Sequence, residues 1–318
     1  MKILANDGIS KSGIEKLEAA GYEVTTETVP QEDLASTINN ENYAALLVRS
    51  ATKVRQDLID ACPGLQLIGR GGVGMDNIDV AYARSIGREV INTPAASSQS
   101  VAELVMAHLF SISRSVYDSN RNMPVNGVSE FKSLKKKYAK GVELRGKTIG
   151  FIGFGRIGQS AATYALGCGM KVIAYDPFMS QAQLHVSVAD QTVTTTVATT
   201  TLDALLETAD YISMHVPMPE NGQAILGVNE FSKMKNGVRI VNAARGGVID
   251  EDALLSACKS GKVAACALDV FVGEPSPRAD VLSVSNMALT PHIGAATVEA
   301  QDRIGTELAD KIIAYFSK

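Results

Sequence analysis

Three side chains with complementary chemistry stand where predicted strands end in the second half of the chain. Arg245 follows the run VRIVNAA, Glu274 follows ALDVFVG, and His292 follows MALTP. Ligands of open α/β sheets bind outside the carboxyl ends of the strands. An arginine can hold a carboxylate bidentately, and a histidine, with a reference pKa of about 6.5, can exchange a proton near neutral pH. With Glu274 orienting His292, the set is suited to taking the hydroxyl proton from a 2-hydroxy acid.

That chemistry requires a hydride acceptor, and the stretch KTIGFIGFGRIG predicts a dinucleotide site. Its first half is an apolar, uncharged run, which is typical of a buried strand in a parallel sheet. Gly153, Gly155 and Gly158 have the G-x-G-x-x-G spacing. The first glycine allows a tight turn, the second lets the backbone approach a pyrophosphate, and the third lets the next helix pack on the strand. The N-terminus of that helix favours phosphate binding.

An acidic residue at the end of the following strand indicates which dinucleotide binds. The strand KVIAYD ends in Asp176, where a carboxylate would accept the adenosine ribose hydroxyls. Its negative charge repels a ribose 2′-phosphate, and no arginine follows directly, so we expect NAD rather than NADP. The alternative is that Asp176 merely begins a turn before Pro177.

Composition excludes several classes of partner. The chain has 318 residues, enough for about two domains, and 46% of them are hydrophobic. A formal net charge of −4 gives no basic field for nucleic acid or a membrane surface. The four cysteines form no C-x-x-C pair, no cluster has the spacing of a metal site, and the amino terminus does not look like a signal peptide. We therefore expect a cytoplasmic protein with a small-molecule substrate and no metal.

The order of the predicted elements is that of an α/β protein. Strands such as KILAND and YAALLVRS alternate with short helices up to Pro94, and a second βα series follows the glycine turn. A long helix is predicted from about Ser100 to Ser119. The polar stretch after it, up to Gly141, shows no clear period. For the Thr-rich segment 181–201 the sequence allows only an edge strand or a loop.

Four strings resemble signature motifs of the D-isomer-specific 2-hydroxyacid dehydrogenases: GFGRIG, NAARGGVIDEDAL, ALDVFVGEP and TPHIGAAT. The resemblance covers nearly the whole chain. It implies an α/β fold of two doubly wound parallel-sheet domains joined by two crossover helices. A flavodoxin-like substrate domain would comprise residues 1–97 and 290–318, and a Rossmann domain for NAD would comprise residues 98–289.

The same resemblance implies roles for particular residues. The catalytic set would be Arg245, Glu274 and His292. The contacts to NAD would come from the glycine turn and from residues that follow it along the chain. They are Gly153, Gly155, Arg156, Ile157, Gly158, Asp176, Val216, Ala243, Ala244, Arg245, Asp269, His292, Ile293, Gly294 and Ala295. Members of the family usually pair through the cofactor domain, so a homodimer or homotetramer is expected.

Three further strings, LLVRSATKV, LIGRGGVGMDNID and INTPAASSQSVAEL, resemble the branch of the family that oxidises 3-phospho-D-glycerate to 3-phosphohydroxypyruvate, the first step of serine biosynthesis. The resemblance is to a short form without a regulatory domain. Arg49 and Ser50 would bind the substrate phosphate, because they follow the strand YAALLV. Gly72, Val73 and Gly74 would offer backbone amides to the substrate carboxylate. Alternatively, Arg49 is a surface ion-pair partner and the glycines form a plain turn.

Two other functions are compatible with the sequence. The first is reduction of glyoxylate, hydroxypyruvate or another unphosphorylated 2-keto acid. The second, from a different class, is an NADH-sensing binding protein similar to certain corepressors. Outside the motifs, we interpret His108 as a packed, hydrogen-bonded core residue. We interpret the five lysines from Lys132 to Lys140 as a solvated face.

Overall fold

The computed structural model describes residues 1–219 and 221–318, and the chain divides into two compact units. Unit 1 comprises Met1–Ser98 and Ala295–Lys318, and unit 2 comprises Gln99–Gly294. The chain therefore passes between the units twice. The second passage lies between Gly294 and Ala295, and the amides of Ile293 and Gly294 donate to Asp269 of unit 2.

Unit 1 is built on a five-stranded parallel sheet with the order β2-β1-β3-β4-β5. The strands are β1 Lys2–Ala5, β2 Glu23–Thr25, β3 Tyr43–Val48, β4 Leu67–Arg70 and β5 Glu89–Asn92. The helices are α1 Lys11–Ala19, α2 Leu34–Glu41, α3 Gln56–Ala61, α4 Val80–Ser85 and α12 Val298–Phe316. All six residues of β3 are buried, because helices cover both faces of the sheet.

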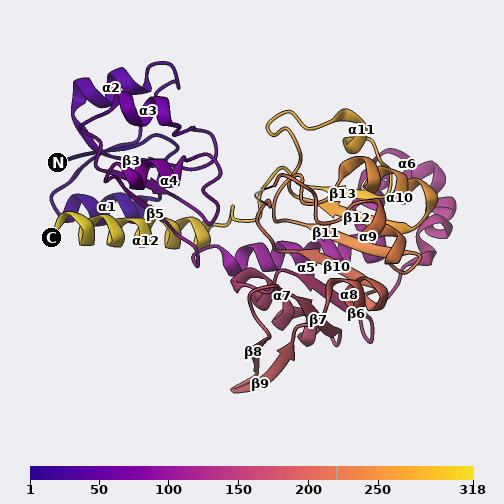
Figure 1. The fold of residues 1–318 in the computed structure, drawn as a ribbon. Helices are drawn as coiled ribbons and strands as arrows, with labels where there is room; N and C mark the ends of the chain where they lie inside the picture. Colours follow the sequence, from indigo (N-terminus) through magenta and orange to yellow (C-terminus); the bar gives the residue numbers. More distant parts are fainter. Residues whose placement is uncertain (220) are drawn as a thin grey trace. The chain divides into compact units, whose positions relative to one another are not determined.

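The two faces of this sheet bury separate cores. Leu4 and Leu46 pack with residues of α2, α3 and α4, whereas Ile3 and Leu47 pack with residues of α1 and α12. Neighbouring strand residues thus alternate between the two cores. Figure 1 shows α1 beside α12, which returns to this unit from the far end of the chain. The doubly wound α/β architecture predicted from the sequence is confirmed here.

Unit 2 contains a six-stranded parallel sheet with the order β13-β12-β11-β10-β6-β7. The strands are β6 Thr148–Ile152, β7 Lys171–Tyr175, β10 Tyr211–Met214, β11 Val238–Asn242, β12 Val263–Leu268 and β13 Met287–Leu289. The chain runs from β6 to β7 on one side and then places β10 on the other side of β6. The carboxyl end of β6 is therefore a topological switch point, where such sheets bind ligands.

Helices cover both faces of the second sheet as well. They are α5 Ser98–Arg114, α7 Arg156–Gly167, α8 Leu202–Thr208, α9 Val228–Lys233, α10 Glu251–Ser260 and α11 Ala279–Leu282. One core joins the sheet to α8, α9, α10 and α11, and the other joins it to α5 and α7. The second α/β unit predicted from the sequence is confirmed.

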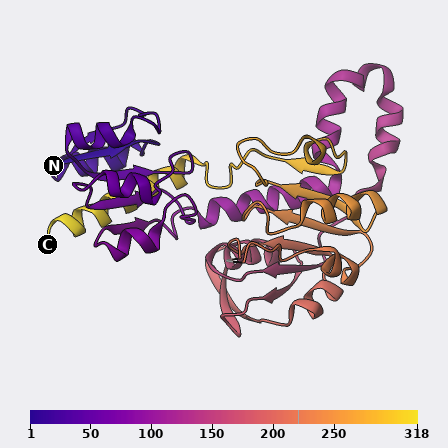
Figure 2. The same cartoon turned by 45° about the horizontal axis from the view of Figure 1, so that its top comes forward.

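The polar stretch that follows α5 is helical, which the sequence did not predict. α5 ends at Arg114, and α6 runs from Val116–Lys137 with a kink at Glu130, followed by a short 3₁₀ turn at Tyr138–Lys140. In α6 only Leu134 is buried, so no apolar stripe marks the helical period. Figure 2 shows this magenta segment as a helical hairpin, and Asp118 closes its base by bonding Lys137 and Tyr138.

The Thr-rich segment forms an antiparallel hairpin of two strands, β8 Gln181–Val188 and β9 Gln191–Ala198. The sequence allowed a strand or a loop here but not a pair of strands. The turn is only two residues long, and Ala189 takes a left-handed conformation in it (φ 51°). Strand β9 leads into Thr199, which forms a parallel bridge with Ala174 of β7.

Among the described residues, no helix is long and apolar enough to cross a membrane. The same part of the chain holds no group of three or more histidine, cysteine or acidic side chains placed to bind a metal ion.

Candidate active site

The three glycines after β6 differ in what surrounds them. Gly153 has a φ of 87°, and a Cβ atom there would lie 2.4 Å from the carbonyl oxygen of His215. A Cβ atom on Gly158 would lie 2.6 Å from the carbonyl oxygen of Gly153. Gly155 has no atom within 4 Å of its Cβ position, so its surroundings are open. The first and third glycines thus allow close backbone packing in the turn. The second leaves the space that a pyrophosphate needs.

Asp176 lies at the carboxyl end of β7 and is tied to this turn. One carboxylate oxygen accepts the amide of Phe154 (2.8 Å), and the other accepts the amide of Phe178 (2.9 Å). The first bond fixes the acid directly beside the glycine turn. An open turn, a helix N-terminus and a fixed carboxylate together fit the pyrophosphate and ribose of a dinucleotide.

Replacing Gly155 by alanine should separate NAD binding from folding. The backbone at Gly155 (φ −71°) suits any residue, and its Cβ position is open, so we expect an unchanged melting temperature. The added methyl group would occupy the space proposed for the pyrophosphate, and overpacking of this kind should raise the Kd for NADH about tenfold or more. Because the chain has no tryptophan, the fluorescence of bound NADH can be titrated directly.

The matched control is Gly153→Ala. Its Cβ would strike the carbonyl oxygen of His215, and φ is positive, so this variant should lose roughly 2 kcal/mol of unfolding free energy. A Gly155→Ala protein that binds NADH normally, or that melts as early as Gly153→Ala, would contradict the assignment of the turn.

Glu274 and His292 form the hydrogen-bonded pair that the sequence predicts. His292 Nδ1 lies 2.7 Å from Glu274 Oε2, and Glu274 Oε1 accepts the amide of Phe271 (2.9 Å). A carboxylate only accepts, so Nδ1 carries a proton and Nε2 is the nitrogen left to exchange one with a substrate. Both side chains are partly exposed, at 40% for His292 and 34% for Glu274, so the pair is open to a ligand.

Asp269 holds the segment that carries His292. This carboxylate is only 1% exposed and accepts three hydrogen bonds. Oδ1 accepts the Thr290 hydroxyl and the Ile293 amide, and Oδ2 accepts the Gly294 amide, at 2.6, 2.8 and 2.8 Å. His292 has a φ of 55°, a left-handed conformation that a non-glycine residue keeps only when its surroundings impose it. The bonds to Asp269 on the next two residues supply that constraint.

Arg245 follows β11 and lies next to the loop that carries Glu274. Its carbonyl accepts a bond from Asn242 Nδ2 (2.9 Å), and its own Nη1 donates to the carbonyl of Ala244 (2.6 Å). The next residue, Gly246, touches the backbone of Phe271 so closely that a Cβ atom would lie 2.0 Å from its carbonyl oxygen. Because Phe271 also donates to Glu274, the Arg245 and Glu274 loops are in direct contact.

The other predicted cofactor residues, with one exception, lie at the carboxyl ends of the strands of unit 2. Val216 follows β10 and lies beside Gly153, and Ala243 and Ala244 follow β11. Arg156 and Ile157 open α7. Ala295, the exception, is the first residue of the returning segment of unit 1.

In unit 1, Arg49 and Ser50 follow β3 in a loop held by two side chains that the sequence did not single out. Asp7 accepts the amides of Arg49 (2.6 Å) and Thr52 (3.1 Å). Asn77 donates to the carbonyls of Arg49 and Thr52. The partners lie 42 and 28 residues from Arg49, so no local pattern reveals them.

The Arg49 guanidinium itself is half-buried, and it has no hydrogen bond or ion pair with any residue that the structure describes. Burial is the main cause that lowers the pKa of Arg49, and only the charge of Asp7 opposes it. A half-buried guanidinium that makes no hydrogen bond keeps its N–H donors available to an anion.

The predicted anion nest after β4 is smaller than the sequence suggested. The amide of Gly72 donates to the carbonyl of Arg70 (3.0 Å) and is therefore not available to a ligand. The guanidinium of Arg70 covers Gly72 so closely that no Cβ would fit there. The amides of Val73 and Gly74 donate to no atom of the described residues, so two of the three amides remain.

Comparisons with known proteins agree with this geometry. Residues 106–294 match the model of the D-isomer specific 2-hydroxyacid dehydrogenase, NAD binding domain. The chain is 43% identical to hydroxypyruvate reductase of Thermotoga maritima, over 98% of this chain and 97% of that protein. It is 41% identical to D-3-phosphoglycerate dehydrogenase of Archaeoglobus fulgidus, over 98% of this chain but only 57% of that protein.

Among solved structures, the chain is similar to a cofactor (NAD+)-bound 3-phosphoglycerate dehydrogenase of Entamoeba histolytica. The TM-score is 0.78 at 26% identity, over 100% of this chain and 96% of that chain. Sequence, fold and site thus lead to the same assignment. The chain belongs to the D-isomer specific 2-hydroxyacid dehydrogenase family and is an NAD-dependent enzyme, with residues 106–294 as its NAD binding domain.

Proposed function

We propose that this enzyme oxidises 3-phospho-D-glycerate to 3-phosphohydroxypyruvate, the first step of serine biosynthesis, with NAD. The observation that supports a phosphorylated substrate is the half-buried Arg49 guanidinium, which has no partner among the described residues. A phosphate would supply two or three oxygens for this planar donor, and charge-assisted bonds of this kind are strong. In this proposal unit 1 binds the substrate, with Ser50 beside Arg49 and the amides of Val73 and Gly74 on the carboxylate.

The reacting end of the substrate is assigned to unit 2. Arg245 would hold the carboxylate and the carbonyl oxygen, and His292 Nε2 would take the hydroxyl proton. Glu274 stabilises the imidazolium that forms and keeps the ring oriented through its bond to Nδ1. When bound, NAD would supply the hydride acceptor. The glycine turn, Asp176, Val216 and the alanines after β11 would hold the dinucleotide, with Asp269 near the nicotinamide end.

The second candidate is reduction of hydroxypyruvate or glyoxylate. It is favoured by the likeness to the T. maritima hydroxypyruvate reductase, to which the chain is 43% identical, against 41% for the A. fulgidus D-3-phosphoglycerate dehydrogenase. Purified protein offered NADH with 3-phosphohydroxypyruvate, hydroxypyruvate and glyoxylate separates the two. A higher kcat/KM for hydroxypyruvate than for the phosphorylated acid would favour the second candidate.

Replacing Arg49 by glutamine tests the phosphate contact. Loss of the charge-assisted bonds should lower kcat/KM for 3-phosphohydroxypyruvate by roughly 10- to 100-fold and change that for hydroxypyruvate by less than about 3-fold. The control is Arg55→Gln in the same unit, because Arg55 is exposed and already paired with Asp79 (2.8 Å). That change should affect neither substrate. Equal losses of kcat/KM for both acids in Arg49→Gln would show that Arg49 does not bind the phosphate.

We also propose that the enzyme is a homodimer or homotetramer that pairs through unit 2. Supporting this, α6 exposes a series of apolar side chains, with Val125 79%, Val128 105% and Phe131 60% exposed. Changing Val128 to glutamate should leave the fold intact and give monomers in light scattering at micromolar concentration. The control is Val188→Glu in the hairpin, also exposed at 56%. An oligomer that is unchanged in Val128→Glu would contradict pairing through α6.

A further inference from the structure

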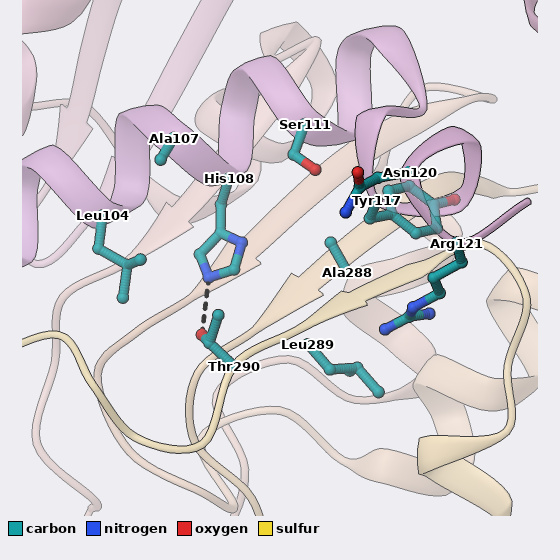
Figure 3. Close-up of a pocket in the computed structure, with 10 residues that line it drawn as sticks. All are labelled: Leu104, Ala107, His108, Ser111, Tyr117, Asn120, Arg121, Ala288, Leu289 and Thr290. Atoms are coloured by element: carbon teal, nitrogen blue, oxygen red, sulfur yellow. Dashed lines mark hydrogen bonds between the residues drawn. The ribbon is translucent and has the colours of Figure 1, made fainter. Parts of the chain in front are cut away.

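A buried histidine in unit 2 lies outside the residues assigned so far. His108 projects from α5 and is only 4% exposed. Its buried neighbours on this helix, such as Val105, Leu109 and Ile112, are apolar. It lines a pocket of about 320 Å³ together with Thr290, Tyr117 and Arg121 (Figure 3). A polar ring in such a place costs free energy unless it makes a hydrogen bond.

The histidine makes that bond to Thr290, the residue that follows β13. His108 Nε2 lies 3.0 Å from Thr290 Oγ1. The threonine hydroxyl has a single proton, and it donates that proton to Asp269 Oδ1 (2.6 Å). Thr290 must therefore accept from His108, which fixes the proton of the imidazole on Nε2. Burial lowers the pKa of His108, in agreement with a neutral ring at neutral pH.

The second ring nitrogen of His108 is Nδ1, because Nε2 faces Thr290. Nδ1 has no hydrogen bond with any described residue, and Figure 3 shows it on the side of the pocket where Asn120 lies. Among the described residues, the hydrogen bond that orients the ring is thus the one to Thr290. An apolar side chain at this position would fill the same space but leave the Thr290 oxygen without a donor.

From Thr290 the connection continues to the segment that carries His292. Asp269 receives the Thr290 hydroxyl and the Ile293 amide on the same oxygen, and the Gly294 amide on the other. His292 precedes these two residues and is held in a left-handed conformation (φ 55°). A Thr290 hydroxyl free to rotate would remove one of the three donors that fix the Asp269 carboxylate.

We propose that His108 is a positioning residue for hydride transfer: by donating to Thr290 it holds the Asp269 carboxylate, and through it the His292 segment, in the reactive arrangement. The inference rests on the proposed role of His292 as acid/base. His108 itself touches no reacting atom, so its loss should lower kcat while KM for the 2-keto acid stays nearly constant.

The test compares two near-isosteric replacements, His108→Gln and His108→Met. Glutamine retains an N–H donor for Thr290 and methionine does not. With NADH and either hydroxypyruvate or 3-phosphohydroxypyruvate, His108→Met should lower kcat about tenfold, a typical size for a coupled hydrogen bond, with KM within about 2-fold. His108→Gln should retain at least about half of the activity. Thermal melting of both variants checks that they fold.

Thr290→Val separates the bonded chain from simple packing, since it removes the hydroxyl but keeps the shape. In the Thr290→Val background, His108→Met should lower kcat by less than about 2-fold, because the connection is already broken. Equal kcat in His108→Gln and His108→Met, or an undiminished effect of His108→Met in Thr290→Val, would overturn the inference. His292→Asn is measured alongside: if it is nearly inactive while His108→Met is normal, only this inference fails, and if it is fully active, the proposed mechanism fails as well.

Discussion

Replacement of His292 by asparagine is expected to lower kcat by about 10²- to 10⁴-fold, the range found when a general acid/base is lost. Asparagine suits the test for two structural reasons. It tolerates the left-handed conformation of His292 (φ 55°) better than most residues, and its amide can replace Nδ1 as a donor to Glu274. Only the group at Nε2 is then removed, so melting temperature and NADH affinity should stay close to those of the wild type.

The measurement is steady-state kcat with NADH and a 2-keto acid, together with an NADH titration by fluorescence. The matched control is His185→Asn. His185 lies in the exposed hairpin, where its Nδ1 contacts Thr194 Oγ1 (3.1 Å), so this variant should keep full activity. A His292→Asn enzyme with a kcat within about 3-fold of the wild type would rule out His292 as the acid/base.

Much of the fold was predictable because buried parallel strands leave a plain signal. The run YAALLV has no charge, and its six residues are all buried in β3, so hydrophobicity alone marks it. The family motifs add the expectation of two doubly wound domains. The α6 hairpin left no such signal, because Leu134 is its only buried residue and it contains Pro124 and Gly127. Both residues disfavour helix interiors, so the sequence pattern argued against the helix that forms.

The parts of the site differ in the same way. Asp176 follows its strand directly, and the glycines have a recognisable spacing, so both are visible in the sequence. The bonds that hold the site are not. Thr290 lies 182 residues from His108, and Asp7 lies 45 residues from Thr52. A side-chain contact between distant segments depends on the packing of whole elements, which no local motif encodes. His108 resembles any other buried residue of α5 until its partner is known.

The second large effect is expected at Arg245, from a change that keeps the charge. Arg245→Lys replaces the planar guanidinium with a point charge, which cannot hold a carboxylate bidentately. The Arg245 side chain is half-buried, so water does not readily replace the lost bonds. Truncating one partner of a buried, hydrogen-bonded charge pair costs about 2–5 kcal/mol. We expect Arg245→Lys to lower kcat/KM for the 2-keto acid by about 10²-fold and Arg245→Ala by more, with NADH affinity within about 3-fold.

A control on β11, the strand that precedes Arg245, shows whether the loss comes from the substrate contact. Arg239 in β11 lies over the ring of Tyr211, 5.7 Å from its centroid, so Arg239→Lys should affect stability slightly and kcat/KM hardly at all. Guanidinium ion added at millimolar concentration should restore part of the activity of Arg245→Ala and none of that of His292→Asn, because only the first variant lacks a guanidinium. If Arg245→Lys retains normal kcat/KM, or if guanidinium restores neither variant, the carboxylate is held by another group.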